Sequence, residues 1–214
     1  HFNEIKSSGD LYIKKSSNVT KLKSEFDFLE NVPDHLTDYF VKVFEFAKEP
    51  DFSQYSMVSH DIKDVSYLFL SNRLNEDSFK ILMTLLQKYF EDAKKPQINP
   101  FVKNSFEDLL KKNVTRLNEL KELEYYESLN SFLLNFKGIS ISDHHLRIQK
   151  ELKRREKTYR KENYIFSHGD LCFSNILFSA QDQEIKLIDP KGYENSGMRS
   201  PYYDMAKLSH SIFG

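Results

Sequence analysis

Residues 164–192 read YIFSHGDLCFSNILFSAQDQEIKLIDPKG and contain two short apolar runs, at 175–178 and 185–188. The polar residues between them, 179–184, are few enough to join the two runs as a hairpin. The second run is rich in β-branched and aliphatic side chains, which predicts a buried strand. We therefore expect a hairpin with the loop 167–174 at one of its ends.

Three side chains with oxygen atoms belong to that end of the hairpin: Asp170, Asn175 and Asp189. A carboxylate at a strand end beside an apolar core is unfavourable by several kcal/mol unless a positive charge compensates it. A hard divalent cation would do so, and a small set of oxygen ligands suits Mg²⁺, which retains waters and binds phosphate oxygens. Taken alone, Asp170 could be a turn or helix-cap residue, Asn175 a turn residue, and Asp189 merely the end of a strand. Together they predict phosphoryl transfer, in which a further carboxylate accepts the proton of the attacking hydroxyl.

The same residues carry a resemblance to a known family. His168-Gly-Asp170, four residues, then Asn175, and a strand that ends in Asp189 resemble the catalytic and metal-binding segments of the aminoglycoside phosphotransferase and choline kinase-like family, which are relatives of protein kinases. The resemblance implies that Asp170 is the catalytic base and that Asn175 and Asp189 bind Mg²⁺. It implies that His168 is a scaffold residue of the catalytic loop.

The sequence departs from the protein-kinase form of this motif. Gly169 stands where protein kinases have Arg, and Pro190 stands where they have Phe. Only 14 residues separate Asp189 from Asp204, which leaves little room for an activation loop. These features favour a small-molecule kinase. Asp204 resembles an aspartate of the family that braces the catalytic loop through hydrogen bonds.

Apolar and polar residues alternate at 2–6 and 11–14, which predicts two strands. A helix capped by Thr20 is expected to follow them. The resemblance implies that Lys14 holds the phosphates of ATP and that Glu25 on the helix pairs with it. Lys15 is the competing candidate. We disfavour Lys15 because alternation directs it to the same face as Leu11 and Ile13, which we expect to be the core face.

Two further strands are expected at 41–46 and 55–58, completing a small antiparallel sheet. The resemblance implies that the passage after them binds the adenine of ATP through its backbone, with Met57, Ser59 and His60 as the candidate residues. The family's Gly-rich phosphate loop is absent from the sequence, and we expect it upstream of His1.

We therefore predict an α+β, protein-kinase-like fold of two lobes. Residues 1–62 form the nucleotide-binding lobe, a small antiparallel sheet plus one helix. Residues 63–214 form a mostly helical catalytic lobe that contains the catalytic hairpin and that we expect to continue beyond Gly214. Its helices are expected at the following places: from Asp77 or Ser78 to about residue 95, and at 105–120, 125–136 and 143–161.

Composition excludes several classes of partner. Lys and Arg number 31 against 32 Asp and Glu, so no net charge favours nucleic acid or an anionic membrane. No apolar run approaches the roughly 20 residues of a membrane helix. Cys172 is the only cysteine, which predicts a cytoplasmic protein without disulfides. The sequence does not indicate an oligomeric state.

The predicted activity is transfer of phosphate from ATP, with Mg²⁺, to a hydroxyl of a small molecule such as a sugar, an amino alcohol or an aminoglycoside. The alternative is a catalytically inactive kinase-fold protein that binds nucleotide or serves as a scaffold, which the absent Gly-rich loop favours. A third interpretation is nucleic-acid binding by the basic helix at 143–161, although a solvated helix face explains its charge more simply.

Overall fold

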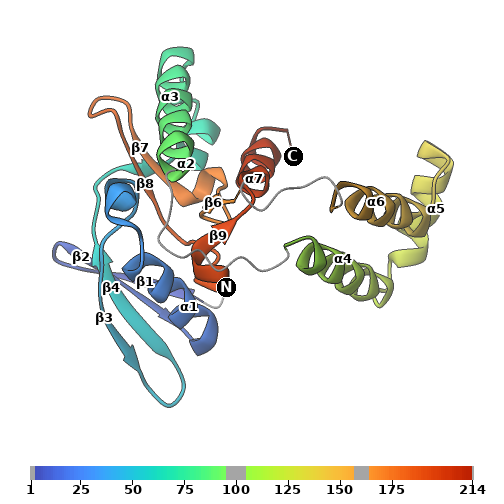
Figure 1. The fold of residues 1–214 in the computed structure, drawn as a ribbon, viewed down its shortest axis with the longest axis horizontal. Coiled ribbons are helices and arrows are strands. Elements are labelled where there is room, and N and C mark those ends of the chain that lie inside the picture. Colours follow the sequence, from blue (N-terminus) through green and yellow to red (C-terminus); the bar gives the residue numbers. More distant parts are fainter. Residues whose placement is uncertain (1–2, 95–104, 157–163, 214) are drawn as a thin grey trace. The chain divides into compact units, whose positions relative to one another are not determined.

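The computed structural model describes residues 3–94, 105–156 and 164–213 (Figure 1). The chain forms two compact units, of which the first combines 1–102 with 164–214 and the second is 103–163. The first unit therefore contains the expected nucleotide-binding lobe together with the expected catalytic segment, 164–192. The lobe boundary at residue 62 stays a prediction.

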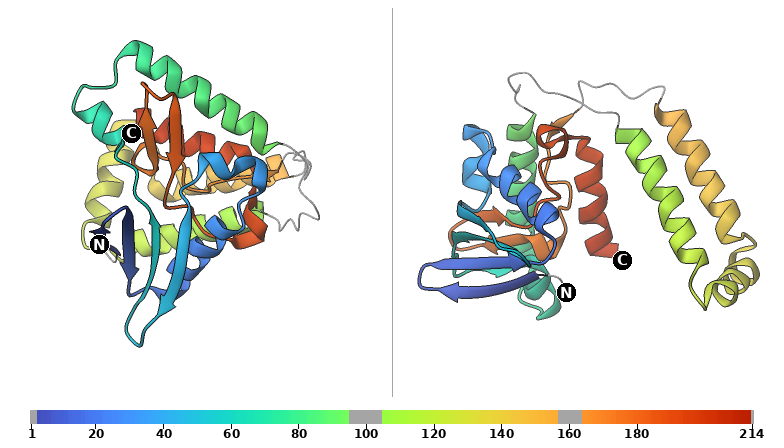
Figure 2. Two further views of the ribbon diagram at one scale, coloured as in Figure 1. Left: turned by 90° about the vertical axis from the view of Figure 1, so that its left-hand side faces the viewer. Right: turned by 90° about the horizontal axis from the view of Figure 1, so that it is seen from below.

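A four-stranded antiparallel sheet opens the first unit. Its strands are β1 (Asn3–Ser8), β2 (Leu11–Ser16), β3 (Val43–Lys48) and β4 (Ser53–Val58), in the spatial order β1-β2-β4-β3 (Figures 1 and 2). The small antiparallel sheet predicted from the alternating pattern is confirmed. Phe2, where we expected the first strand to begin, lies outside the described residues.

One helix, α1 (Val19–Glu30), contacts β2, β3 and β4 of this sheet. Its cap is Asn18 rather than Thr20: the Asn18 side chain accepts a hydrogen bond of 3.0 Å from the Lys21 N–H. Asn and Thr are both good caps, so the sequence pattern alone did not separate them. The helix buries the apolar stripe expected from its spacing, namely Leu22, Phe26 and Leu29.

The predicted hairpin is present. Strand β7 (Ile176–Ser179) pairs antiparallel with β8 (Glu184–Leu187), and β5 (Lys63–Asp64) adds a short third strand. A single 3₁₀ turn, η3 (Phe173–Asn175), leads into the hairpin. Residues Ile176, Phe178, Ile185 and Leu187 are buried, as two apolar runs facing one core require.

The remaining elements of the first unit surround this hairpin. Helix α3 begins after its cap, Asn75, two residues before the expected Asp77, and it contacts β8. The short strands β6 and β9 pair with each other, and α7 follows them directly. The bounds are η1 (Asp34–Tyr39), α2 (Val65–Leu70), α3 (Glu76–Ala93), β6 (Ile165–Phe166), η4 (Glu194–Gly197), β9 (Met198–Arg199) and α7 (Pro201–Phe213).

The second unit consists of α4 (Ser105–Lys121), α5 (Tyr126–Lys137) and α6 (Ile141–Glu156), with α6 contacting both other helices. Helix α5 ends at Gly138, as predicted, in a left-handed cap with φ of 66°. Helix α6 begins two residues before the expected Asp143, and 157–161 of the expected helix lie outside the described residues. Within the described ranges of both units, no helix is long and apolar enough to cross a bilayer.

Candidate active site

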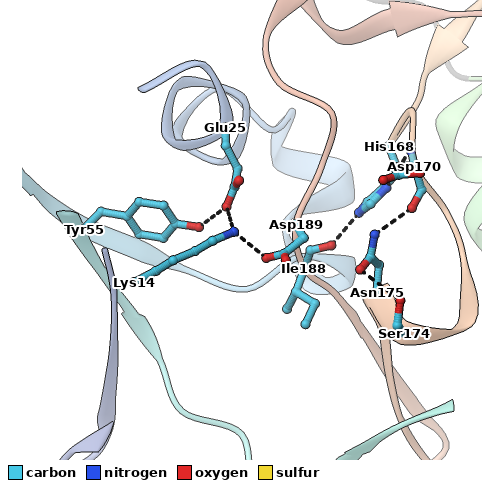
Figure 3. A network of polar contacts seen from close by, with 9 residues as sticks. All are labelled: Lys14, Glu25, Tyr55, His168, Asp170, Ser174, Asn175, Ile188 and Asp189. Atoms are coloured by element: carbon cyan, nitrogen blue, oxygen red, sulfur yellow. Dashed lines mark hydrogen bonds and ion pairs between the residues drawn. The ribbon is translucent and has the colours of Figure 1, made fainter. Parts of the chain in front are cut away.

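Lys14 on β2 is the meeting point of three elements. Its side chain is 1% exposed, and its ammonium donates to Glu25 Oε1 at 2.5 Å and to Asp189 Oδ1 at 2.7 Å (Figure 3). Glu25 comes from α1, and Asp189 follows β8 by two residues. The expected pairing of Lys14 with Glu25 is therefore present, and the ammonium also reaches the segment that follows the hairpin.

The sheet face that carries Lys14 is the reverse of the one we expected to be buried. Lys14 and Ser16 are buried, whereas Leu11 and Ile13 are only half-buried. Lys15, on the opposite face, lies 3.4 Å from the centre of the Phe52 ring. Our reason for disfavouring Lys15 was thus wrong, because α1 covers the Lys14 face and compensates its charge with Glu25.

Tyr55 is a member of this cluster that the sequence did not indicate. It lies directly opposite Lys14 on the neighbouring strand β4, and its hydroxyl donates to Glu25 Oε1 (Figure 3). Burial raises the pKa of Tyr55 well above its usual value, and the Glu25 carboxylate adds to the shift. Burial also raises the pKa of Glu25, which Lys14 opposes. The position of Tyr55 opposite Lys14 depends on strand register, which a single sequence does not show.

His168 joins the catalytic loop to the end of β8. Its Nε2 lies 2.7 Å from the Ile188 carbonyl oxygen, and its Nδ1 accepts from the Asp170 N–H at 3.2 Å (Figure 3). These partners place the single ring proton on Nε2. Burial lowers the pKa of His168, so the ring is neutral at pH 7. A neutral, fully enclosed imidazole with both nitrogens engaged suits the scaffold role.

Gly169 is required at its position for two reasons. Its φ is +78°, in the left-handed region that favours glycine, and an added Cβ would lie 2.9 Å from the Lys191 Cβ and 3.0 Å from Arg199 Nε. Its N–H donates to Asp204 Oδ1 at 2.8 Å. The glycine between His168 and Asp170 therefore allows the loop to approach both neighbours closely.

Asn175 and Asp189 are brought side by side by backbone contacts. The Ile188 N–H donates to the Asn175 carbonyl oxygen at 3.1 Å, and Asn175 Nδ2 donates to the Asp170 carbonyl oxygen at 2.8 Å. This second bond directs the amide nitrogen to the loop. Asn175 Oδ1 accepts a long bond of 3.4 Å from the Ser174 hydroxyl, and its second lone pair can serve as a ligand (Figure 3). Asp189 has a φ of 56°, a conformation uncommon outside glycine and often found at functional sites.

This donor set fits Mg²⁺ bound together with a nucleotide. It offers one amide oxygen from Asn175 and one carboxylate from Asp189 whose side chain is 36% exposed. No cluster of three or more His, Cys, Asp or Glu side chains suited to a metal occurs within 3–94, 105–156 and 164–213. An ion held by Asn175 and Asp189 would complete its coordination with phosphate oxygens and water, as Mg²⁺ commonly does.

Helix α7 contacts the loop 167–174, the expected catalytic loop. Asp204 is fully buried and accepts from the Ser167 hydroxyl at 2.6 Å and from the Gly169 N–H at 2.8 Å, which is the bracing contact the resemblance implied. Burial raises the pKa of Asp204. One turn further along the helix, Lys207 Nζ lies 2.7 Å from Asp170 Oδ1. Sequence reasoning missed Lys207, although its spacing of three residues from Asp204 places both on one helix face.

Arg199 is, like Lys14, a buried cation. The sequence analysis did not indicate it. It donates to the Ser167 carbonyl oxygen at 2.9 Å and to the Gly192 carbonyl oxygen at 2.5 Å. These bonds join the start of the catalytic loop to the segment that follows Asp189. The residue precedes α7 in a short strand, where nothing in the local pattern distinguishes it from a surface arginine.

The expected adenine-binding passage follows β4. Met57 is buried in the sheet, and His60 is half-buried, with its pKa lowered by burial. The Ser59 N–H donates to the Asp10 carbonyl oxygen at 2.9 Å, so a contact from Ser59 to adenine needs another of its polar groups. The assignment of Met57, Ser59 and His60 to the nucleotide stays a prediction.

Comparison with known proteins identifies the fold. No protein-family model and no curated protein sequence matches the chain. Among solved structures, an aminoglycoside-3'-phosphotransferase of type VIII matches with a TM-score of 0.61 at 16% identity, over 100% of this chain and 79% of its own. A thermostable mutant of the aminoglycoside phosphotransferase APH(4)-Ia matches with a TM-score of 0.57 at 10% identity, over 95% and 70%. An ethanolamine kinase of Plasmodium vivax matches with a TM-score of 0.52 at 15% identity, over 99% and 61%.

At these identities the likeness establishes the fold. The chain has the protein-kinase-like fold shared by aminoglycoside phosphotransferases and ethanolamine kinase, and the fold resemblance read from 164–192 is confirmed.

Proposed function

We propose that this protein is a small-molecule kinase that transfers the γ-phosphoryl group of ATP to a hydroxyl of its acceptor in the presence of Mg²⁺. The observation that carries the proposal is the contact of Lys14 with both Glu25 and Asp189, which lies in the same unit as Asp170 and Asn175. The fold supports the proposal too, since the similar solved structures bear the names of kinases that act on small molecules.

Lys14 is the residue we assign to the nucleotide phosphates. An ammonium group has three donors, and Glu25 and Asp189 accept two of them. The third donor remains for a phosphate oxygen. Met57, Ser59 and His60 are assigned to the adenine side of the same nucleotide. Mg²⁺, held by Asn175 and Asp189, would neutralise charge on the phosphates and orient them.

Asp170 is the residue we assign as catalytic base. Its Oδ1 faces Lys207, and its second carboxylate oxygen remains for the acceptor hydroxyl. In the reaction, the acceptor oxygen forms a bond to the γ-phosphorus while the bond to the β-phosphate oxygen breaks. The hydroxyl proton passes to Asp170, and ADP leaves. His168 contributes by holding the loop, since neither of its nitrogens is free for substrate.

The test is an ADP-release assay of the full-length protein with Mg²⁺–ATP and three panels of acceptors: sugars, amino alcohols and aminoglycosides. We expect release with one panel, and we expect Asp170→Asn to lower kcat by about 10² to 10⁴ with the KM for ATP little changed. Asp189→Asn should raise the Mg²⁺ concentration needed for half-maximal rate. A full-rate Asp170→Asn variant would remove the base assignment.

The second candidate is an inactive kinase-fold protein that binds nucleotide. It predicts ATP binding, measured by calorimetry, without ADP release for any acceptor. Absence of both binding and release would contradict both candidates. We place the protein in the cytoplasm in either case, because its single cysteine, Cys172, has no disulfide partner.

A further inference from the structure

One face of α7 contacts the catalytic loop at three successive turns. Asp204 accepts from Ser167 and Gly169, Lys207 pairs with Asp170, and Ser211 Oγ accepts from the Phe173 N–H at 3.1 Å. The helix positions differ by three and four residues, which is the spacing of one helix face. The loop therefore runs along α7, and Lys207 is the contact in the middle.

The three contacts differ in how accessible they are. Asp204 is fully buried, so its bonds to the loop are needed for folding. The side chains of Lys207 and Asp170 are 39% and 41% exposed, and ion pairs at such exposure contribute little to stability. A contribution to stability therefore does not explain why Lys207 Nζ lies 2.7 Å from Asp170 Oδ1.

We propose that Lys207 is a positioning residue for phosphoryl transfer, holding the Asp170 carboxylate by Oδ1 so that its other oxygen faces the acceptor hydroxyl. This role rests on the proposed kinase function. Loss of the pair would remove the ionic contact that fixes Asp170 Oδ1, and a reacting group displaced by about 1 Å can slow transfer by about 10²-fold.

Within the described residues, the ion pair of Lys207 is with Asp170. The close contact with Asp170 is the largest cause of the raised pKa of Lys207, with burial opposing it. Lys207 therefore remains charged throughout the pH range of an assay.

The experiment compares Lys207→Met and Lys207→Arg with Lys80→Met in the ADP-release assay. The acceptor is the one that the wild type phosphorylates, or water if the wild type only hydrolyses ATP. Lys80 is a matched control, since it forms an exposed ion pair with Glu76 at 2.8 Å on α3. We expect Lys207→Met to lower kcat about 10²-fold with the KM for ATP unchanged, Lys207→Arg to recover most of the loss, and Lys80→Met to match wild type. The Tm of Lys207→Met should fall by about 2 °C or less.

A double-mutant cycle tests whether Lys207 acts through Asp170. In the Asp170→Asn background, Lys207→Met should change the residual rate by less than about threefold. Lysine NMR gives a readout without turnover: the pKa of Lys207 should fall in Asp170→Asn, because its ion-pair partner has lost its charge.

The possible outcomes separate this inference from the proposed function. If the wild type is active and Lys207→Met is fully active too, the positioning role alone is overturned. It is also overturned if Lys207→Met lowers kcat by the same factor in the Asp170→Asn background as in the wild type. An unchanged pKa of Lys207 in Asp170→Asn also overturns it. A wild type that neither phosphorylates an acceptor nor hydrolyses ATP overturns the kinase function and this role together.

Discussion

Lys14 and Asp189 are 175 positions apart in the chain, and their side chains meet at 2.7 Å between Nζ and Oδ1. The same ammonium binds Glu25 at 2.5 Å, so one buried cation joins the sheet, α1 and the end of the β7–β8 hairpin. A buried charge is tolerated only when it is paired and hydrogen-bonded. The contact therefore serves the stability of the unit as well as the chemistry we assign to it.

Lys14→Met should destabilise the protein by about 3–5 kcal/mol, because it leaves Glu25 buried without its cation. Lys15→Met is the matched control on the same strand, since Lys15 is half-buried and its ammonium lies over the Phe52 ring in a cation–π interaction, worth about 0.5–1 kcal/mol. Urea denaturation measures both free energies of unfolding. If Lys14→Met and Lys15→Met lower the free energy of unfolding equally, the ion pair of Lys14 with Glu25 does not account for the loss.

Tyr55→Phe should lower the free energy of unfolding by about 1.5–3 kcal/mol, since it removes a hydrogen bond to the buried Glu25 carboxylate and leaves that oxygen with Lys14 alone. Tyr12→Phe is the control in the same sheet, because the Tyr12 hydroxyl has no hydrogen-bond partner within the described ranges. Thermal unfolding of the two variants distinguishes them. If Tyr55→Phe is as stable as Tyr12→Phe, the hydrogen bond from Tyr55 to Glu25 does not stabilise the fold.

Gly169→Ala should be more damaging than Gly9→Ala. Both glycines have positive φ, +78° and +62°, so each alanine carries a backbone strain of about 1–2 kcal/mol. An added Cβ meets nothing within 4 Å at Gly9, whereas at Gly169 it lies 2.9 Å from the Lys191 Cβ. Overpacking should add about 1–3 kcal/mol at Gly169, and chemical denaturation measures the difference. If the two losses are the same, the loop can move away from its neighbours.

The neutral state of His168 predicts a pH dependence of stability. Burial lowers the pKa of His168 below its ordinary value of 6.5, so the unfolded chain binds the proton more readily than the folded one. The stability contributed by neutral His168 is therefore present above pH 6.5 and is lost as the pH falls. Relative to His168→Gln, the wild type should lose up to about 1.4 kcal/mol per pH unit as the pH falls below 6.5, until the folded-state pKa of His168 is reached. A pH-independent difference between the two proteins would mean that His168 titrates normally.

Local pattern was sufficient for much of the fold. The hairpin at 175–188, the sheet strands and the helices of the second unit follow from alternation, helical spacing and turn residues, because these depend on neighbours in the chain. The helix caps were displaced: Asn18 and Asn75 cap α1 and α3 in place of Thr20 and Asp77 or Ser78. Asn, Asp, Ser and Thr cap almost equally well, so only the actual hydrogen bond distinguishes them.

The buried face of β2 could not be predicted in the same way. Alternation states that Lys14 and Lys15 point to opposite faces, but it does not say which face α1 covers. We chose the face of Leu11 and Ile13 from hydrophobicity, and the structure buries the face of Lys14. A buried lysine overrides the usual rule when a carboxylate on a neighbouring element compensates its charge, as Glu25 does here.

The sequence by itself determined which residue types stand at the positions we assign to catalysis and which elements carry them, since His168, Asp170, Asn175 and Asp189 lie within one continuous segment. Tertiary structure alone decided the contacts of Lys14 with Asp189, of Tyr55 with Glu25 and of Lys207 with Asp170. The physical reason is that each of these contacts joins different elements, whose side chains meet only after strand register and helix packing have been fixed.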